Sequence, residues 1–141
     1  MKKILTLIIL SFVFVSCKED PNPCAGYGFE CTATVESHWE LVEVFSSPGS
    51  GGSFNEVESD RTITIFENGD FISKGSLCVI DINNVEIQTG EIEHTTTESK
   101  MVFFGCSGND ETERTFTVDG DEMIVEFSCF EGCAHKYKRV N

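Results

Sequence analysis

The strongest constraint on the fold is that apolar residues recur at every second position, in short segments separated by turn residues. Eight such segments occur along the chain, at residues 38–45, 61–66, 71–75, 90–95, 100–104, 114–118, 123–127 and 135–140. Alternation with a period of two is typical of half-buried β-strands, and no stretch keeps the 3.6-residue period of an amphipathic helix. The sequence therefore predicts an all-β fold.

The turns predict how these strands are joined. Asn68-Gly69 and Asp119-Gly120 lie between neighbouring segments, and both dipeptides favour the positive φ angles of a tight hairpin. Eight short strands with close turns predict an eight-stranded antiparallel meander. Closure into a small barrel removes the sheet edges, so we expect a barrel; a two-sheet sandwich is the alternative.

Two stretches do not follow the alternation. In the first segment Trp39, Leu41 and Phe45 are expected on one face, but Glu43 interrupts that face and predicts a bulge. Residues 46–60 are rich in Ser, Pro and Gly and predict a long flexible loop. They lack the Lys-Ser/Thr and the following helix of a phosphate cradle, so we expect at most a flap beside the barrel mouth.

The N-terminus has the composition of an export signal. Lys2 and Lys3 precede an apolar run over residues 4–15, which is shorter than the about 20 residues needed to span a bilayer. A basic head, a short apolar centre and a small residue before the cut are typical of a secretory signal peptide. An ordinary secreted protein cut at another position is the alternative.

Val15-Ser16-Cys17 resembles the bacterial lipobox, at which lipid is attached to the cysteine sulfur and the chain is cut just before it. The resemblance implies residues 1–16 as the lipoprotein signal peptide, Cys17 as the lipidated residue, 17–36 as a tether and 37–141 as the folded domain. Several acyl chains on one cysteine imply stable membrane attachment. Lys18-Glu19-Asp20 resembles the acidic tag that directs some lipoproteins to the outer face of the outer membrane.

Six cysteines remain once Cys17 is assigned to lipid: Cys24, Cys31, Cys78, Cys106, Cys129 and Cys133. An even number in a small exported domain predicts disulfides, although six cysteines allow 15 pairings. Sequence separation favours Cys24–Cys31 and Cys129–Cys133 as local loops, which leaves Cys78–Cys106. A different pairing among the last four cysteines is the main alternative.

Charge and motifs exclude several functions. The formal net charge is −14, with 24 acidic and 10 basic residues, and nucleic acid is not expected as a partner because phosphate contacts need clustered Lys and Arg. His38, His94 and His135 lie in no catalytic motif, so we expect no enzyme activity. The spacing of Cys129, Cys133 and His135 is not that of a zinc finger, and oxidation would remove the thiolates. No metal and no cofactor are predicted.

The body from residue 37 resembles small bacterial lipocalin-like lipoproteins. The residues that carry this resemblance are Trp39-Glu40-Leu41-Val42, the hairpin Ile63-Thr64-Ile65-Phe66-Glu67-Asn68-Gly69-Asp70-Phe71, and the closing Tyr137-Lys138-Arg139. Gly75-Ser76-Leu77-Cys78 with Gly90 and Gly105-Cys106 is also similar, more weakly, to META-domain envelope proteins. The lipocalin resemblance implies a small barrel with one open mouth. Together with the aromatic content of the chain, it motivates the hypothesis of non-catalytic binding of a small apolar molecule.

Ten alternating apolar residues are expected to face the interior: Trp39, Leu41, Ile63, Ile65, Phe71, Phe103, Phe116, Val125, Phe127 and Tyr137. An aromatic lining suits a small apolar ligand, and Trp39 and Phe71 would line the cavity with the 46–60 loop as its gate. The alternative is that these side chains fill the core of a barrel this small, in which case the domain is a structural or interaction module. We expect a protein of either kind to be a lipid-anchored monomer at the outer membrane.

Overall fold

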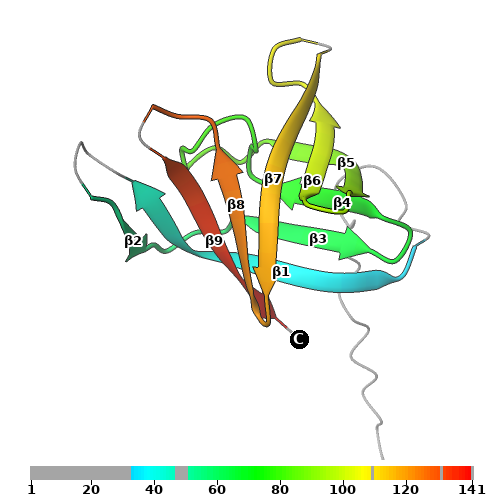
Figure 1. Cartoon of the computed structure of the whole chain (residues 1–141), viewed down its shortest axis with the longest axis horizontal. Helices are drawn as coiled ribbons and strands as arrows, with labels where there is room; N and C mark the ends of the chain where they lie inside the picture. The colour runs from blue at the N-terminus through cyan, green and yellow to red at the C-terminus, as the bar shows by residue number, and fades with distance from the viewer. Residues whose placement is uncertain (1–32, 47–50, 109, 131, 141) are drawn as a thin grey trace, which may run out of the picture. The chain divides into compact units, whose positions relative to one another are not determined.

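The computed structural model describes residues 33–46, 51–108, 110–130 and 132–140 (Figure 1). The strands in these ranges are β1 (Val35–Ser46), β2 (Ser53–Glu56), β3 (Thr62–Phe66), β4 (Asp70–Lys74), β5 (Ile87–His94), β6 (Ser99–Phe104), β7 (Glu111–Asp119), β8 (Glu122–Phe127) and β9 (Cys133–Val140). Within the described ranges, no helix has the length and apolar character required to cross a membrane.

The strands form one antiparallel sheet in the order β2-β1-β3-β4-β5-β6-β7-β8-β9. Strand β1 also pairs with β9, from His38 opposite Val140 to Ser46 opposite Cys133, and this second pairing closes the sheet into a barrel. Strands β1 and β3 to β9 form the barrel, and β2 is an additional strand alongside the second half of β1. The predicted all-β, eight-stranded antiparallel meander barrel is confirmed.

The predicted bulge in the first strand is also confirmed, and it changes which residues face the core. The register of β1 against β9 shifts between Leu41 and Glu43. Beyond the shift Val44, and not Phe45, packs against the core, because one extra residue moves every later side chain to the other face. The prediction that Phe45 shares a face with Trp39 and Leu41 is therefore wrong.

The predicted loop over residues 46–60 contains a strand. Residues 53–56 form β2, which pairs with β1 from Glu43 opposite Glu56 to Ser46 opposite Ser53. The ring of Phe54 lies 5.3 Å from that of Phe45, so the side chain that the bulge turns away from the core is covered by β2. The prediction of a continuous loop is wrong at 53–56, and residues 47–50 lie outside the described ranges.

The barrel interior is packed with the side chains of one apolar cluster. Its members are Trp39, Leu41, Ile63, Ile65, Phe71, Leu77, Met101, Phe103, Phe116, Met123, Val125, Phe127 and Tyr137, each at most 9% exposed. Gly90 lies between Phe71 and Phe103 in the sheet, where a Cβ would stand 2.1 Å from the Val102 carbonyl oxygen and 2.8 Å from the Phe71 ring. Glycine at this position lets the two rings meet edge to face at 6.2 Å.

We expect neighbouring phenylalanines on β6 to differ sharply in their effect on stability. Phe103 is 0% exposed and Phe104 is 61% exposed. Phe103→Ala should lower the free energy of unfolding by about 3–5 kcal/mol, whereas Phe104→Ala should change it by less than about 0.5 kcal/mol. Urea unfolding with the disulfides intact measures both, and equal losses in the two variants would contradict the assigned faces of β6.

Candidate functional site

One end of the barrel carries the connections β4–β5, β6–β7 and β8–β9, and we call it the mouth end. These connections lie together because the strands of a meander alternate in direction (Figure 1). The hairpin turns β3–β4 and β7–β8 lie at the opposite end. The β4–β5 connection is the longest of these three connections, and it covers the mouth of the barrel.

Residues 75–86, which we call the plug, enter the mouth from the end of β4. Leu77 is 0% exposed and belongs to the apolar cluster, and Cys78 and Ile82 pack against it. The Gly75 amide donates a hydrogen bond to the Glu86 carbonyl at 2.9 Å, which joins the two ends of the plug. The plug has no regular secondary structure, so most of its backbone groups need partners from outside it.

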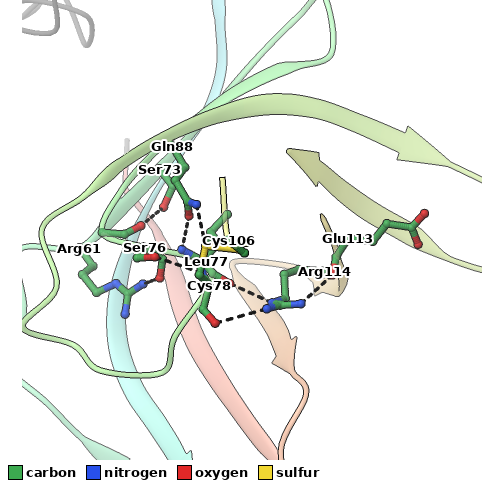
Figure 2. Close-up of a disulfide and its surroundings, with 10 residues drawn as sticks. Arg61, Ser73, Ser76, Leu77, Cys78, Gln88, Cys106, Glu113 and Arg114 are labelled. Carbon is green, nitrogen blue, oxygen red and sulfur yellow. Dashed lines mark hydrogen bonds between the residues drawn. A yellow bond between two sulfur atoms is a disulfide. The ribbon is translucent and has the colours of Figure 1, made fainter. Parts of the chain in front are cut away.

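A set of inward-facing polar side chains supplies many of these partners, and we call it the polar collar; Figure 2 shows Arg61, Ser73, Gln88 and Arg114 of this set. Its members are Arg61, Ser73, Gln88, Arg114 and His135. Ser73, Gln88, Arg114 and His135 lie toward the mouth ends of β4, β5, β7 and β9, and Arg61 directly precedes β3. The collar is thus the layer of the interior nearest the mouth.

Arg61 binds the plug at two points. Its Nη1 donates to the Asp81 carbonyl at 3.1 Å, and its Nη2 donates to the Ser76 carbonyl. The side chain is 2% exposed, and burial lowers the pKa of its guanidinium. A Cβ on Gly75 would lie 2.3 Å from Arg61 Nε, so the glycine at the start of the plug makes room for the arginine.

The other collar residues hold the remaining plug backbone. Arg114 Nε donates to the Leu77 carbonyl at 2.9 Å, and Gln88 Oε1 accepts from the Leu77 amide. His135 Nε2 lies 3.0 Å from the Ile80 carbonyl oxygen. The plug is therefore held by the residue before β3 and by side chains of β5, β7 and β9.

Two disulfides lie at the mouth end. Cys78–Cys106 joins the plug to the β6–β7 connection, and Cys129–Cys133 closes the β8–β9 connection, so both predicted pairs are confirmed. Their sequence separations of 28 and 4 correspond to roughly 3–4 and roughly 2 kcal/mol of loop-closure stabilisation. Disulfides of this kind indicate a compartment outside the cytoplasm. The predicted Cys24–Cys31 pair and the lipidation residue Cys17 lie outside the described residues.

Two side chains of the interior, His135 of the collar and Tyr137 next to it on β9, have strongly shifted pKa values. His135 is 0% exposed; burial, and after it the charge of Arg61, lowers its pKa to about 4. Burial raises the pKa of the Tyr137 hydroxyl to about 12, against the opposing effect of Arg61. Both rings are therefore neutral at neutral pH. The pairing of Cys129 with Cys133 removes the thiolates that a zinc site with His135 would use.

The structure places all ten predicted lining residues in the buried apolar cluster, which confirms that they face inward. Their role in ligand binding stays a prediction. The sequence pattern did not predict the collar or the plug, because apolar and polar residues do not alternate over residues 77–85. The sequence did contain a signal for the collar. Arg61 lies two and four residues before the inward-facing Ile63 and Ile65, and His135 lies two residues before Tyr137, so the alternation places both on the inward face.

The fold and the site together define a small closed β-barrel with a side-chain-filled interior and a disulfide-linked plug in its mouth. Comparison with protein-family models, with curated proteins and with solved structures gives no match. The function is therefore argued from this chain alone.

We expect stability to fall between pH 6.5 and pH 4 because of His135. The unfolded state takes up this proton near pH 6.5 and the native ring only near pH 4, so in this window the unfolded state binds more protons. Integrated over the window, the loss is about 3 kcal/mol. Asp81, whose pKa is lowered chiefly by hydrogen bonds from Asn83, acts below this window.

Urea unfolding at a series of pH values measures the effect. His135→Gln keeps an N–H for the Ile80 carbonyl and does not titrate, so it should remove most of the slope between pH 6.5 and pH 4. A slope that is the same in the variant and the natural protein would contradict the assignment.

Proposed function

We propose that this protein is a lipid-anchored envelope protein whose barrel is a non-catalytic interaction module, and that it presents its mouth end to a partner protein. The lipobox-like residues around Cys17 and the two disulfides support export and anchoring, and the acidic Lys18-Glu19-Asp20 tag supports display at the outer membrane surface. The barrel is compatible with a lipocalin-like fold. The single observation that carries the interaction role is the set of apolar side chains exposed at the mouth.

These exposed residues form what we call the apolar rim: Val79, Val85, Ile87, Phe104 and Phe130. Only Val35 and Val118 are comparably exposed large apolar residues elsewhere in the described chain, and both lie at the opposite end. Phe130 is fully exposed and lies between the disulfide-bonded Cys129 and Cys133. The bond limits the freedom of this short connection, so less entropy is lost when Phe130 is buried by a partner.

The charge of the mouth end indicates the chemistry of the partner. The plug, the β6–β7 connection and the β8–β9 connection contain no Lys or Arg. Exposed acidic side chains are present, among them Asp81, Glu86 and Glu111, while the two nearby arginines turn inward to the plug. A partner with an apolar groove flanked by Lys or Arg would complement this surface.

A small apolar ligand inside the barrel is the second candidate. The observation that favours it is that Leu77 of the plug is part of the interior cluster, so displacement of the plug would open apolar space within that cluster. In the closed form, the ten predicted lining residues pack against one another. The interaction role is therefore the better supported of the two.

The anchor is tested by fractionation of cells that make the protein with its own leader. The natural protein should be found with membranes, and its mature form should begin at an acylated Cys17. Cys17→Ala should remove the acyl chains and the processing that depends on them, while Cys24→Ala should be processed and acylated normally. A natural protein that retains residues 1–16 with an unmodified Cys17 thiol would contradict the proposal.

The role of the mouth is tested by chemical crosslinking on intact cells, with adducts resolved by mass. We expect a discrete adduct with the natural protein, lost or reduced at least about tenfold in the double variant Phe104→Glu and Phe130→Glu, because hot-spot aromatics each contribute about 2 kcal/mol or more. Val118→Glu, an exposed apolar residue at the opposite end, is the matched control and should keep the adduct.

Two results would reject the mouth as the interface. One is the absence of any discrete adduct; the other is an adduct that survives in the double variant and is lost in Val118→Glu. A saturable change in Trp39 fluorescence on addition of a saturated long-chain fatty acid, with no discrete adduct, would instead support the small-ligand candidate.

A further inference from the structure

Three buried polar atoms in the described residues have no hydrogen-bond partner: Arg61 Nε, His135 Nδ1 and the Tyr137 hydroxyl oxygen. Their side chains are 2%, 0% and 0% exposed. The rings of His135 and Tyr137 are 6.2 Å apart, and the Arg61 charge acts on both. Buried polar groups almost always have partners, so three together below the plug point to a polar group that binds among them.

The charge of this cluster indicates an anion. Arg61 is a permanent cation, and its two hydrogen bonds go to neutral backbone carbonyls. No described carboxylate oxygen lies within 4.0 Å of it, and the exposed Asp81 carboxylate accepts its hydrogen bonds from Asn83. The charge of Asp81 raises the pKa of Arg61 and so offsets part of the burial cost, but it does so from an exposed position without an ion pair. The remaining cost of the buried charge would fall if an opposite charge bound directly beside it.

The hydrogen-bonding pattern narrows the kind of anion. His135 Nε2 faces the Ile80 carbonyl oxygen, so Nε2 carries the hydrogen and Nδ1 of the neutral ring is an acceptor. Arg61 Nε–H and the Tyr137 O–H are donors. The complementary group accepts two hydrogen bonds and donates one. A bare carboxylate would set an oxygen lone pair against His135 Nδ1, whereas water would satisfy the hydrogen bonds and leave the charge uncompensated.

We propose that Arg61, His135 and Tyr137 form a binding site below the plug for one small oxyanion that carries a hydroxyl hydrogen, the class to which bicarbonate and glycolate belong. The anionic oxygens accept from Arg61 and Tyr137, and the hydroxyl donates to His135. This site lies inside the barrel, so it goes beyond the interaction role of the apolar rim.

The test is thermal unfolding of the disulfide-intact protein at pH 7.5 and constant ionic strength, with four sodium salts compared at equal concentration. Bicarbonate or glycolate should raise the melting temperature more than acetate and nitrate do, by an amount that grows with concentration. Tyr137→Phe should reduce the difference, and Arg61→Gln should abolish it. Arg139→Gln is the matched control, because Arg139 stacks on Trp39 at 4.6 Å at the opposite end of the barrel.

Tyr137→Phe removes one hydroxyl, so it keeps the test decisive even where Arg61→Gln does not fold. Equal shifts with all four salts, or no shift with bicarbonate and glycolate, would overturn the proposal. So would a crystal structure grown in bicarbonate that shows only water between the three side chains. Because the apolar rim is intact in every variant, the crosslinking result for the mouth does not depend on this outcome.

Discussion

The pairing of β1 with β9 is the constraint on which the rest of the structure depends. In the barrel, each strand pairs with the barrel strand that follows it in the chain, whereas the first and last strands, β1 and β9, pair only because the sheet closes. Closure leaves no long unpaired edge in the barrel itself, and an unpaired edge is a template for aggregation. It also brings His135 and Tyr137 on β9 next to β1, whose Leu41 amide bonds the carbonyl of Arg61.

Closure of the barrel creates an interior, and the plug that covers this interior needs the collar as a source of hydrogen-bond partners. A connection without secondary structure is normally kept at the surface, because its buried backbone groups would lack partners. Here the carbonyls of five plug residues accept from Arg61, Arg114 and His135: Ser76, Leu77, Cys78, Ile80 and Asp81. Hydrogen bonds from charged donors contribute about 1.5–3 kcal/mol each. The hydrogen bonds from two inward-facing arginines thus allow a loop without secondary structure to cover the end of the apolar core.

Much of the barrel could be predicted from sequence, because alternation and turn residues are local signals. Ile63-x-Ile65 and Phe71 flank Asn68-Gly69, and that pattern alone gives one hairpin and its inward face. Phe45 and Phe54 show where local reasoning fails, since the consequence of the bulge depends on the register against β9, which lies about 90 residues away in the chain. The plug could not be predicted for a related reason. Its partners Arg61, Arg114 and His135 come from three distant segments of the chain, and only the folded barrel brings them together.

A barrel filled with apolar side chains leaves its mouth as the place for the proposed interaction role. In a small eight-stranded barrel the interior is just wide enough for side chains, and here Trp39, Phe71 and Tyr137 occupy it. The plug adds Leu77 to that core and keeps Val79 and Val85 outside, so one segment both completes the interior and forms part of the apolar rim. The Cys78–Cys106 disulfide links the plug, which carries Val79, to the connection that follows Phe104, and so holds two parts of the rim together. An exported domain with this arrangement presents a preformed apolar surface, so a partner that binds it has little ordering entropy left to overcome.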